Sequence, residues 1–178
     1  MKKAVVVLCV VAVLLAVFGG FVTGKLIQTR EELAQRHFDE WYAMYRMTEL
    51  VEMKGKEESA SLLLLVNHMG HYGPANWSLD GMDVRTFLQD YENLLRVVAE
   101  AEDSQLAADG YALLEELNGK MKEISGKVLE VCRVEDGSYS GRISPEHPAV
   151  KAAMEELKAL YGEYLDSLEE IAKRFNEA

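Results

Sequence analysis

Cysteine and proline are both scarce in this sequence, and each scarcity excludes a class of protein. Of the two cysteines, Cys9 lies inside the first apolar run and Cys132 lies far beyond it. A disulfide within the polar domain and a zinc site built from thiolates are therefore excluded. The three prolines are too few for a disordered, proline-rich stalk. We expect Cys132 to be a buried small hydrophobe, with a bridge between two chains as the alternative.

The sequence also lacks the short motifs of the common enzyme classes. It contains no GxSxG nucleophile elbow, no P-loop and no Rossmann glycine fingerprint. Its paired Glu and Asp residues fall on helix faces, where solvated carboxylates are ordinary, and no Glu-x-x-His pair has the spacing of a di-iron bundle. We therefore expect a protein that is not an enzyme and that has no cofactor.

One feature is abundant instead, an uncharged apolar run from Ala4 to Thr23. About 20 residues at 1.5 Å per residue match the roughly 30 Å hydrocarbon core of a bilayer. Because Lys2 and Lys3 precede the run, the positive-inside rule places the N-terminus in the cytoplasm and the rest of the chain outside. The prediction divides a single-pass membrane protein into a cytoplasmic head, a transmembrane signal-anchor and an extracytoplasmic domain, at residues 1–3, 4–24 and 25–178.

Small residues recur along one face of this run. They lie four residues apart, at Ala12, Ala16, Gly20 and Gly24. Such a stripe lets two helices approach closely in lipid, so it indicates pairing of membrane helices; the alternative is chance, because Ala and Gly are common in such helices. The small residues of Val22-Thr23-Gly24 also suit a signal peptidase, so the alternative localisation is secretion after cleavage near Gly24.

Negative charge dominates the chain after the apolar run. The whole chain has a net charge of −11, and because all 30 acidic residues follow Arg30, residues 31–178 carry −15. A domain of this charge is repelled by nucleic acid and by anionic lipid surfaces. We expect contact with membrane lipid through the N-terminal anchor, no nucleic acid partner, and a protein partner or a homo-oligomer.

The spacing of apolar residues beyond the anchor is helical throughout, and no segment alternates with period two. Four helices are expected, at about 25–69, 83–102, 104–133 and 145–176. Their apolar faces are predicted to include Leu33 to Val51 on the first helix, Val84 to Val98 on the second, Leu106 to Val131 on the third and Val150 to Phe175 on the last. Together with the anchor they predict an all-α fold, an N-terminal transmembrane helix followed by an antiparallel (up-down-up-down) four-helix bundle. That order would place the loops at 67–82 and 134–144 at the membrane-distal tip and the C-terminus near the membrane.

Turn and capping residues predict two local features near the last helix. Asp136-Gly137 is typical of a tight turn, so a small hairpin is expected there. Ser144 followed by Pro145 predicts the N-cap and the first residue of the last helix.

The longest irregular stretch, residues 67–82, holds the strongest candidates for chemistry. His68, His71, Asp80 and Asp83 are of the ligand types that zinc and other divalent transition metals accept. A His-x-x-His pair alone is a weak signal, however, and a solvated loop is the alternative.

Aromatic residues offer a second kind of candidate site. Tyr72 and Trp77 in the same loop are candidate partner-binding residues, because exposed aromatics often anchor interfaces; a Trp77 folded back on the bundle is the alternative. An aromatic band on the first helix is expected to be core, with a small-molecule pocket as the alternative, and it consists of Phe38, Trp41, Tyr42 and Tyr45.

The plan of a basic head, one anchor and a helical exported domain resembles that of LemA-type membrane proteins. Leu94–Leu117 is similar to that family in its Val-Ala-Glu and Glu-Leu segments. The arginine pair and Pro-Asn segment of that family are absent around Tyr45–Lys56, so the resemblance implies no function here. Chemoreceptor-like four-helix sensors are another analogue, but such modules have a second membrane helix after the bundle, which this sequence lacks.

The sequence therefore favours a membrane-anchored, non-catalytic helical scaffold or protein-interaction module that faces outside the cytoplasm. The alternative is a small-molecule or metal-binding extracytoplasmic sensor domain that uses the 67–82 loop and the aromatic band of the first helix.

Overall fold

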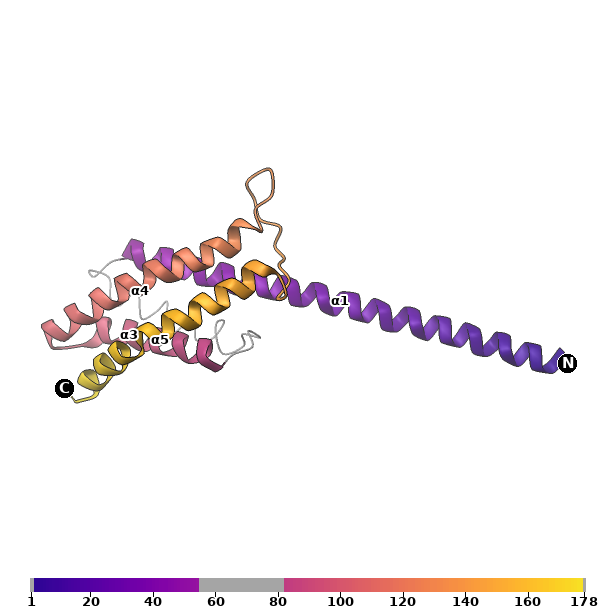
Figure 1. Cartoon of the computed structure of the whole chain (residues 1–178), viewed down its shortest axis with the longest axis horizontal. Helices are drawn as coiled ribbons and strands as arrows, with labels where there is room; N and C mark the ends of the chain where they lie inside the picture. Colours follow the sequence, from indigo (N-terminus) through magenta and orange to yellow (C-terminus); the bar gives the residue numbers. More distant parts are fainter. Residues whose placement is uncertain (1, 55–81, 178) are drawn as a thin grey trace.

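The computed structural model describes residues 2–54 and 82–177, with side chains at 19, 20, 22–52 and 86–177. Within these ranges the chain forms α-helices and no named strand: α1 (Lys2–Lys54), α3 (Met82–Glu100), α4 (Ser104–Glu130) and α5 (Pro148–Glu177). These described helices pack together as a bundle (Figure 1). The prediction of an all-α bundle is therefore confirmed for the described part of the chain.

The helix α1 joins the apolar run to the bundle without a break. Its 53 residues extend about 80 Å at 1.5 Å per residue. The first part of α1 projects from the bundle as a single helix (Figure 1), and the side chains from Val22 to Leu33 are all exposed. In the part of the chain that the structure describes, no helix combines the length and the apolar character needed to cross a membrane. The predicted anchor at 4–24 falls mainly on side chains outside the described set, so it stays a prediction.

The helix α4 lies at the centre of the bundle, because α1, α3 and α5 all contact it. The ion pairs show that α5 runs antiparallel to α4. Lys127 near the end of α4 pairs with Glu156 near the start of α5, and Asp109 near the start of α4 pairs with Arg174 near the end of α5. The helix α3 is also antiparallel to α4, since only three residues separate them.

The direction of α1 corrects the predicted up-down-up-down order. Phe38 of α1 contacts Tyr139, just beyond the end of α4, whereas Glu52 pairs with Lys122 further back along α4. The helix α1 is thus antiparallel to α4 and runs in the same direction as α3 and α5 (Figure 1). The prediction had made α1 and α3 antiparallel, because it assumed that the chain simply reverses between the first two helices of the bundle.

This order also changes the positions of the loops. Residues 131–147, between α4 and α5, lie where α1 leaves the bundle, an end that we call the base (Figure 1). The N–H of Ile143 donates to the carbonyl oxygen of Ala34 on α1 at 2.9 Å. The prediction that the 134–144 loop lies at the tip, with the C-terminus at the opposite end near the membrane, is therefore wrong. Since α4 runs toward the base, α5 must start there and end at the far side.

The apolar faces predicted from the sequence form a common core, with three exceptions, one of which is Tyr42 of the aromatic band, 39% exposed. Val131 is 51% exposed because it is the C-cap of α4, and Leu33 is 36% exposed because α1 has not yet entered the bundle at that point. The predicted residues that are buried on α3 and α4 include Phe87, Leu88, Tyr91, Leu94, Leu95, Val98, Leu106, Leu114, Leu117, Met121, Ile124 and Val128. On α5 they include Val150, Met154, Leu157, Tyr164, Leu168 and Ile171.

Two glycines allow the neighbours of α4 to pack closely on it. A Cβ atom at Gly110 would lie 3.4 Å from Val97 of α3, and one at Gly126 would lie 3.6 Å from the ring of Tyr45 on α1. A glycine in a helix interior costs about 1 kcal/mol relative to alanine. Packing against α1 and α3 offsets that cost, so α4 is continuous from Ser104 to Glu130.

The start of α5 differs from its predicted position. Pro148 is the first helical residue, and the Nδ1 atom of His147 accepts the N–H of Ala149 at 3.2 Å, as an N-cap does. The predicted cap, Ser144, instead forms a turn in which its carbonyl accepts the N–H of His147. Ser144 and His147 both precede a proline, and the sequence favoured Ser144 because serine is the more common N-cap residue.

The predicted hairpin at Asp136-Gly137 is confirmed. The N–H of Val134 donates to the carbonyl of Ser138 at 2.9 Å, and Arg133 and Tyr139 form an isolated antiparallel bridge. Gly137 has a φ of 84°, a conformation that glycine adopts without strain. This hairpin forms one edge of the base.

The opposite burial of two valines on α4 provides a matched test of the fold. Val128 is fully buried, whereas Val131 is half-exposed. We expect Val128→Ala to lower the free energy of unfolding by about 2 kcal/mol, through lost burial and a residual cavity. Val131→Ala should change it by less than about 0.5 kcal/mol. Chemical denaturation measures both values, and equal losses would contradict the described end of α4.

Candidate functional site

Most of the predicted chemical and partner-binding residues lie outside the described part of the chain. These are His68, His71, Tyr72, Trp77 and Asp80. Asp83 lies in the first turn of α3, but its side chain is not among those described. Among the described residues, no group of three or more His, Cys, Asp or Glu side chains could hold a metal ion. The metal and partner sites of the 67–82 loop thus stay predictions.

The predicted stripe of small residues lies on the projecting part of α1. Gly20 and Gly24 are exposed, and a Cβ atom at either position would meet no described atom within 4 Å. Ala12 and Ala16 lie on the same helix, at positions whose side chains are outside the described set. The structure therefore leaves this face of α1 open at both described glycines, and helix pairing stays a prediction.

The aromatic band of α1 is divided between the core and the base. Trp41 is fully buried and Phe38 is 7% exposed, as expected for core residues. Tyr42 is 39% exposed and stacks on Phe38 with ring centroids 5.7 Å apart. The ring of Tyr139 from the hairpin lies 5.9 Å from both of these rings. The band therefore attaches the hairpin to α1 and helps to fill the core.

Cys132 is buried and free, as predicted for a small hydrophobic residue. Its thiol donates to the carbonyl of Val128 at 3.4 Å. Burial raises the pKa of this thiol, which keeps it protonated near neutral pH and slow to react.

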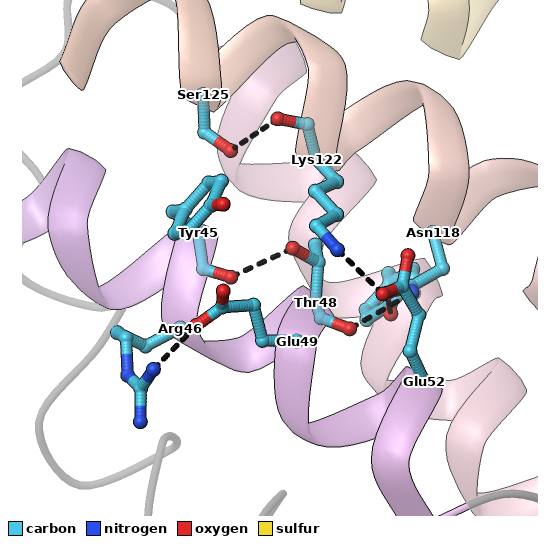
Figure 2. A network of polar contacts seen from close by, with 9 residues as sticks. Tyr45, Arg46, Thr48, Glu49, Glu52, Asn118, Lys122 and Ser125 are labelled. Atoms are coloured by element: carbon cyan, nitrogen blue, oxygen red, sulfur yellow. Dashed lines mark hydrogen bonds and ion pairs between the residues drawn. The ribbon is translucent and has the colours of Figure 1, made fainter. Parts of the chain in front are cut away.

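A buried polar connection links three helices at the centre of the bundle, and we call it the seam (Figure 2). The hydroxyl of Tyr91 on α3 donates to Oδ1 of Asn118 on α4 at 2.7 Å. The Nδ2 atom of Asn118 donates to the carbonyl of Thr48 on α1 at 3.0 Å. All three residues are at most 2% exposed, and burial raises the pKa of Tyr91, so its hydroxyl stays a donor.

Charged residues border the seam where it reaches solvent. The ammonium group of Lys122 on α4 lies 2.5 Å from a carboxylate oxygen of Glu52 on α1, and Arg46 pairs with Glu49 along α1 (Figure 2). The hydrogen bond to Glu52 raises the pKa of Lys122. A partly exposed pair of this kind stabilises the fold by only about 0–1 kcal/mol, so its main effect is on the register of α1 against α4.

Nearer the base, a buried histidine lies on α1. His37 is 2% exposed, and its Nδ1 atom lies 3.7 Å from Oε2 of Glu40. The other oxygen of that carboxylate, Oε1, accepts a hydrogen bond from Arg36 at 3.1 Å. Burial, and then the positive charge of Arg36, lower the pKa of His37. The imidazole is therefore neutral in the folded protein near neutral pH.

The seam was not predicted from the sequence, although a signal for it exists. Asn118 follows Leu117 and precedes Met121 by three residues, and Ser125 lies four residues beyond Met121. Both polar residues therefore interrupt the apolar stripe of α4, where a buried polar group needs a partner. The partners themselves could not be identified, because Thr48 and Tyr91 are distant in sequence.

Removal of the Asn118 amide tests the energetic importance of the seam. We expect Asn118→Ala to lower the free energy of unfolding by about 2–4 kcal/mol, because the Tyr91 hydroxyl loses its buried acceptor. Tyr91→Phe should lower the free energy of unfolding less in the Asn118→Ala variant than in the native protein, and the difference should be about 1 kcal/mol or more. Asn93→Ala on the exposed face of α3 is the control. Additive losses in denaturation experiments would show that the two groups are not coupled.

The neutral state of His37 predicts a pH dependence of stability. The unfolded chain takes up a proton at this residue near pH 6.5, whereas the folded chain resists protonation until a lower pH. The free energy of unfolding should therefore be highest above pH 6.5 and should fall as the pH is lowered from about 7.5 to 5.5. Denaturation curves measured at about pH 7.5 and about pH 5.5 should show a smaller fall in the free energy of unfolding for His37→Gln than for the native chain. An unchanged fall in this variant would refute the assignment.

Comparison with known proteins leaves the chain without an assigned family. No protein-family model, no curated protein and no solved structure matches it. The resemblance to LemA-type membrane proteins therefore gains no support from these comparisons.

Proposed function

We propose that this protein is a single-pass membrane-anchored, non-catalytic helical scaffold or protein-interaction module that faces outside the cytoplasm. One observation carries the proposal. The uncharged run from Ala4 to Thr23 belongs to the same helix, α1, that packs on α4 in the bundle. An apolar run of this length is compatible with a bilayer and unfavourable for a lone helix in water.

The continuity of α1 explains what the anchor contributes to such a module. A helix without a break transmits position and orientation, whereas a flexible linker would transmit neither. The bundle would thus be held at a defined height above the membrane, with the base toward the lipid. The basic head at Lys2 and Lys3 supports the N-in orientation.

The interaction role rests on surfaces away from the core. The acidic domain favours protein partners over nucleic acid, and the segment 67–82 supplies Tyr72 and Trp77 as candidate contacts. Pairing through the stripe of Ala12, Ala16, Gly20 and Gly24 would add a homo-oligomer. The sensor alternative is less favoured, because Phe38 and Trp41 of the aromatic band are buried in the core.

Membrane extraction tests the anchor. We expect the full chain to stay in the membrane pellet at alkaline pH. Leu14→Asp with Leu15→Asp should release it, since each charge near the centre of a membrane helix costs about 3 kcal/mol. Gln28→Asp, at an exposed position beyond the run, is the control and should remain in the pellet. Release of the native chain at alkaline pH would refute the anchor. A mature chain whose measured mass corresponds to an N-terminus near Gly24 would establish the secreted alternative.

A crosslinking experiment tests the interaction role and the orientation together. An impermeant thiol reagent applied to intact cells should label Ser138→Cys, at the exposed hairpin, and should not label Lys2→Cys. In the same cells, crosslinking should capture a protein complex that is lost when Tyr72 and Trp77 are both changed to Ala. Retention of every partner by this double variant would rule out the 67–82 contact surface.

A further inference from the structure

A cleft of about 630 Å³ lies at the base, between α1 and the segment that leads into α5. One wall is formed by Arg30, Glu31, Leu33 and Ala34 of α1, and the other by Arg142, Ser144, Pro145 and Glu146. The hydrogen bond from Ile143 to Ala34 holds the two walls together. The cleft is thus a built feature of the fold, made by residues more than 100 positions apart.

The cleft contains both signs of charge in a particular arrangement. Arg142 lies 3.7 Å from Glu31, a distance beyond hydrogen bonding, so most of its N–H donors remain available to a ligand. No described residue forms an ion pair with Arg30. Glu146 forms an ion pair with Lys151, which does not line the cleft, at 2.5 Å. Two guanidinium groups and two carboxylates therefore meet around an apolar floor of Leu33, Ala34 and Pro145.

The position of the cleft on α1 relates it to the proposed anchor. Arg30 lies seven residues beyond Thr23, which corresponds to about 10 Å along the helix. The polar headgroup layer on each side of a bilayer is several ångströms thick, so the cleft would lie at or just above it. Leu26 and Ile27, which precede Arg30 by one helical turn, are 58% and 55% exposed and extend the apolar face toward the lipid.

We propose that this cleft binds the headgroup of a zwitterionic aminophospholipid from the outer leaflet, an inference that rests on the proposed membrane anchor. Arg30 and Arg142 donate hydrogen bonds to the phosphate, and Glu31 and Glu146 attract the ammonium group. Leu26 and Ile27 contact the upper part of an acyl chain. Guanidinium groups suit phosphate because their planar N–H groups donate in pairs.

The charge of the domain favours this lipid over an anionic one. Residues 31–178 carry a net charge of −15, so the domain as a whole repels a lipid with a net negative charge. A zwitterionic headgroup avoids that repulsion and matches both signs of charge in the cleft. An inorganic phosphate or an anionic headgroup carries no cationic group to match Glu31, whose carboxylate lies in the cleft beside Arg142.

Lipid retention by the full chain tests the proposal. The protein is reconstituted in vesicles of equal parts phosphatidylethanolamine, phosphatidylcholine and phosphatidylglycerol, extracted in mild detergent, and analysed for bound lipid by mass spectrometry. The native chain should retain phosphatidylethanolamine in excess of phosphatidylglycerol. Arg30→Gln with Arg142→Gln should reduce that excess about tenfold, which corresponds to one or two charge-assisted hydrogen bonds. Arg96→Gln, on the exposed face of α3, is the matched control.

The carboxylates give an independent readout. Glu31→Gln with Glu146→Gln should shift retention from phosphatidylethanolamine toward phosphatidylglycerol, a change of preference that a merely structural role would not produce. Equal retention of the three lipids by the native chain, or a preference for phosphatidylglycerol, would overturn the proposal. Displacement of the lipid by millimolar inorganic phosphate would show a phosphate site rather than a lipid site, and would also overturn it.

Failure of this inference can be separated from failure of the anchor. Alkaline extraction of the same membranes reports on the anchor alone. If the native chain is retained there but carries no preferred lipid, the cleft proposal is wrong and the anchor stands. If the native chain is released, the membrane placement on which both depend is wrong.

Discussion

The docking of α1 on α4 is the contact on which the rest of the arrangement depends. Its centre is one buried amide, Asn118, which accepts from Tyr91 and donates to Thr48. Displacement of α1 would break the hydrogen bond from Asn118 to the Thr48 carbonyl, and a buried amide donor without a partner costs more than a repacked apolar contact. The seam therefore selects one register of α1 from the several that apolar packing alone would accept.

A single register for α1 has consequences along its whole length. From Thr23 to Ala34, where the base touches α1, the helix rises about 16 Å. The base is thus held at a definite distance from the apolar run by a continuous helix. Residues 131–147 return to α1 at that level, so the hairpin, the aromatic contacts and the charged cleft all gather at the same end of the bundle (Figure 1).

The helical faces could be predicted from the sequence because each described helix buries one stripe. The face from Phe87 to Val98 is correct at every described position. Val131 and Leu33 are exposed because the apolar stripes in the sequence extend beyond the packed region, past the end of α4 at Val131 and before α1 enters the bundle at Leu33. The direction of α1 relative to α3 could not be predicted, since periodicity says nothing about how the chain returns between helices. The cleft was missed because Arg30 and Arg142 meet only through tertiary structure.

Zero-length carbodiimide coupling of the full chain is the most direct measurement of the docking of α1 on α4. It joins amines to carboxylates that are in direct contact, and peptide mass spectrometry identifies the pairs. The account predicts coupling of Lys122 to Glu52, together with Lys127 to Glu156 as an internal reference for the α4–α5 contact. Coupling of the reference pair, with Lys122 joined to carboxylates other than those of α1, would contradict it.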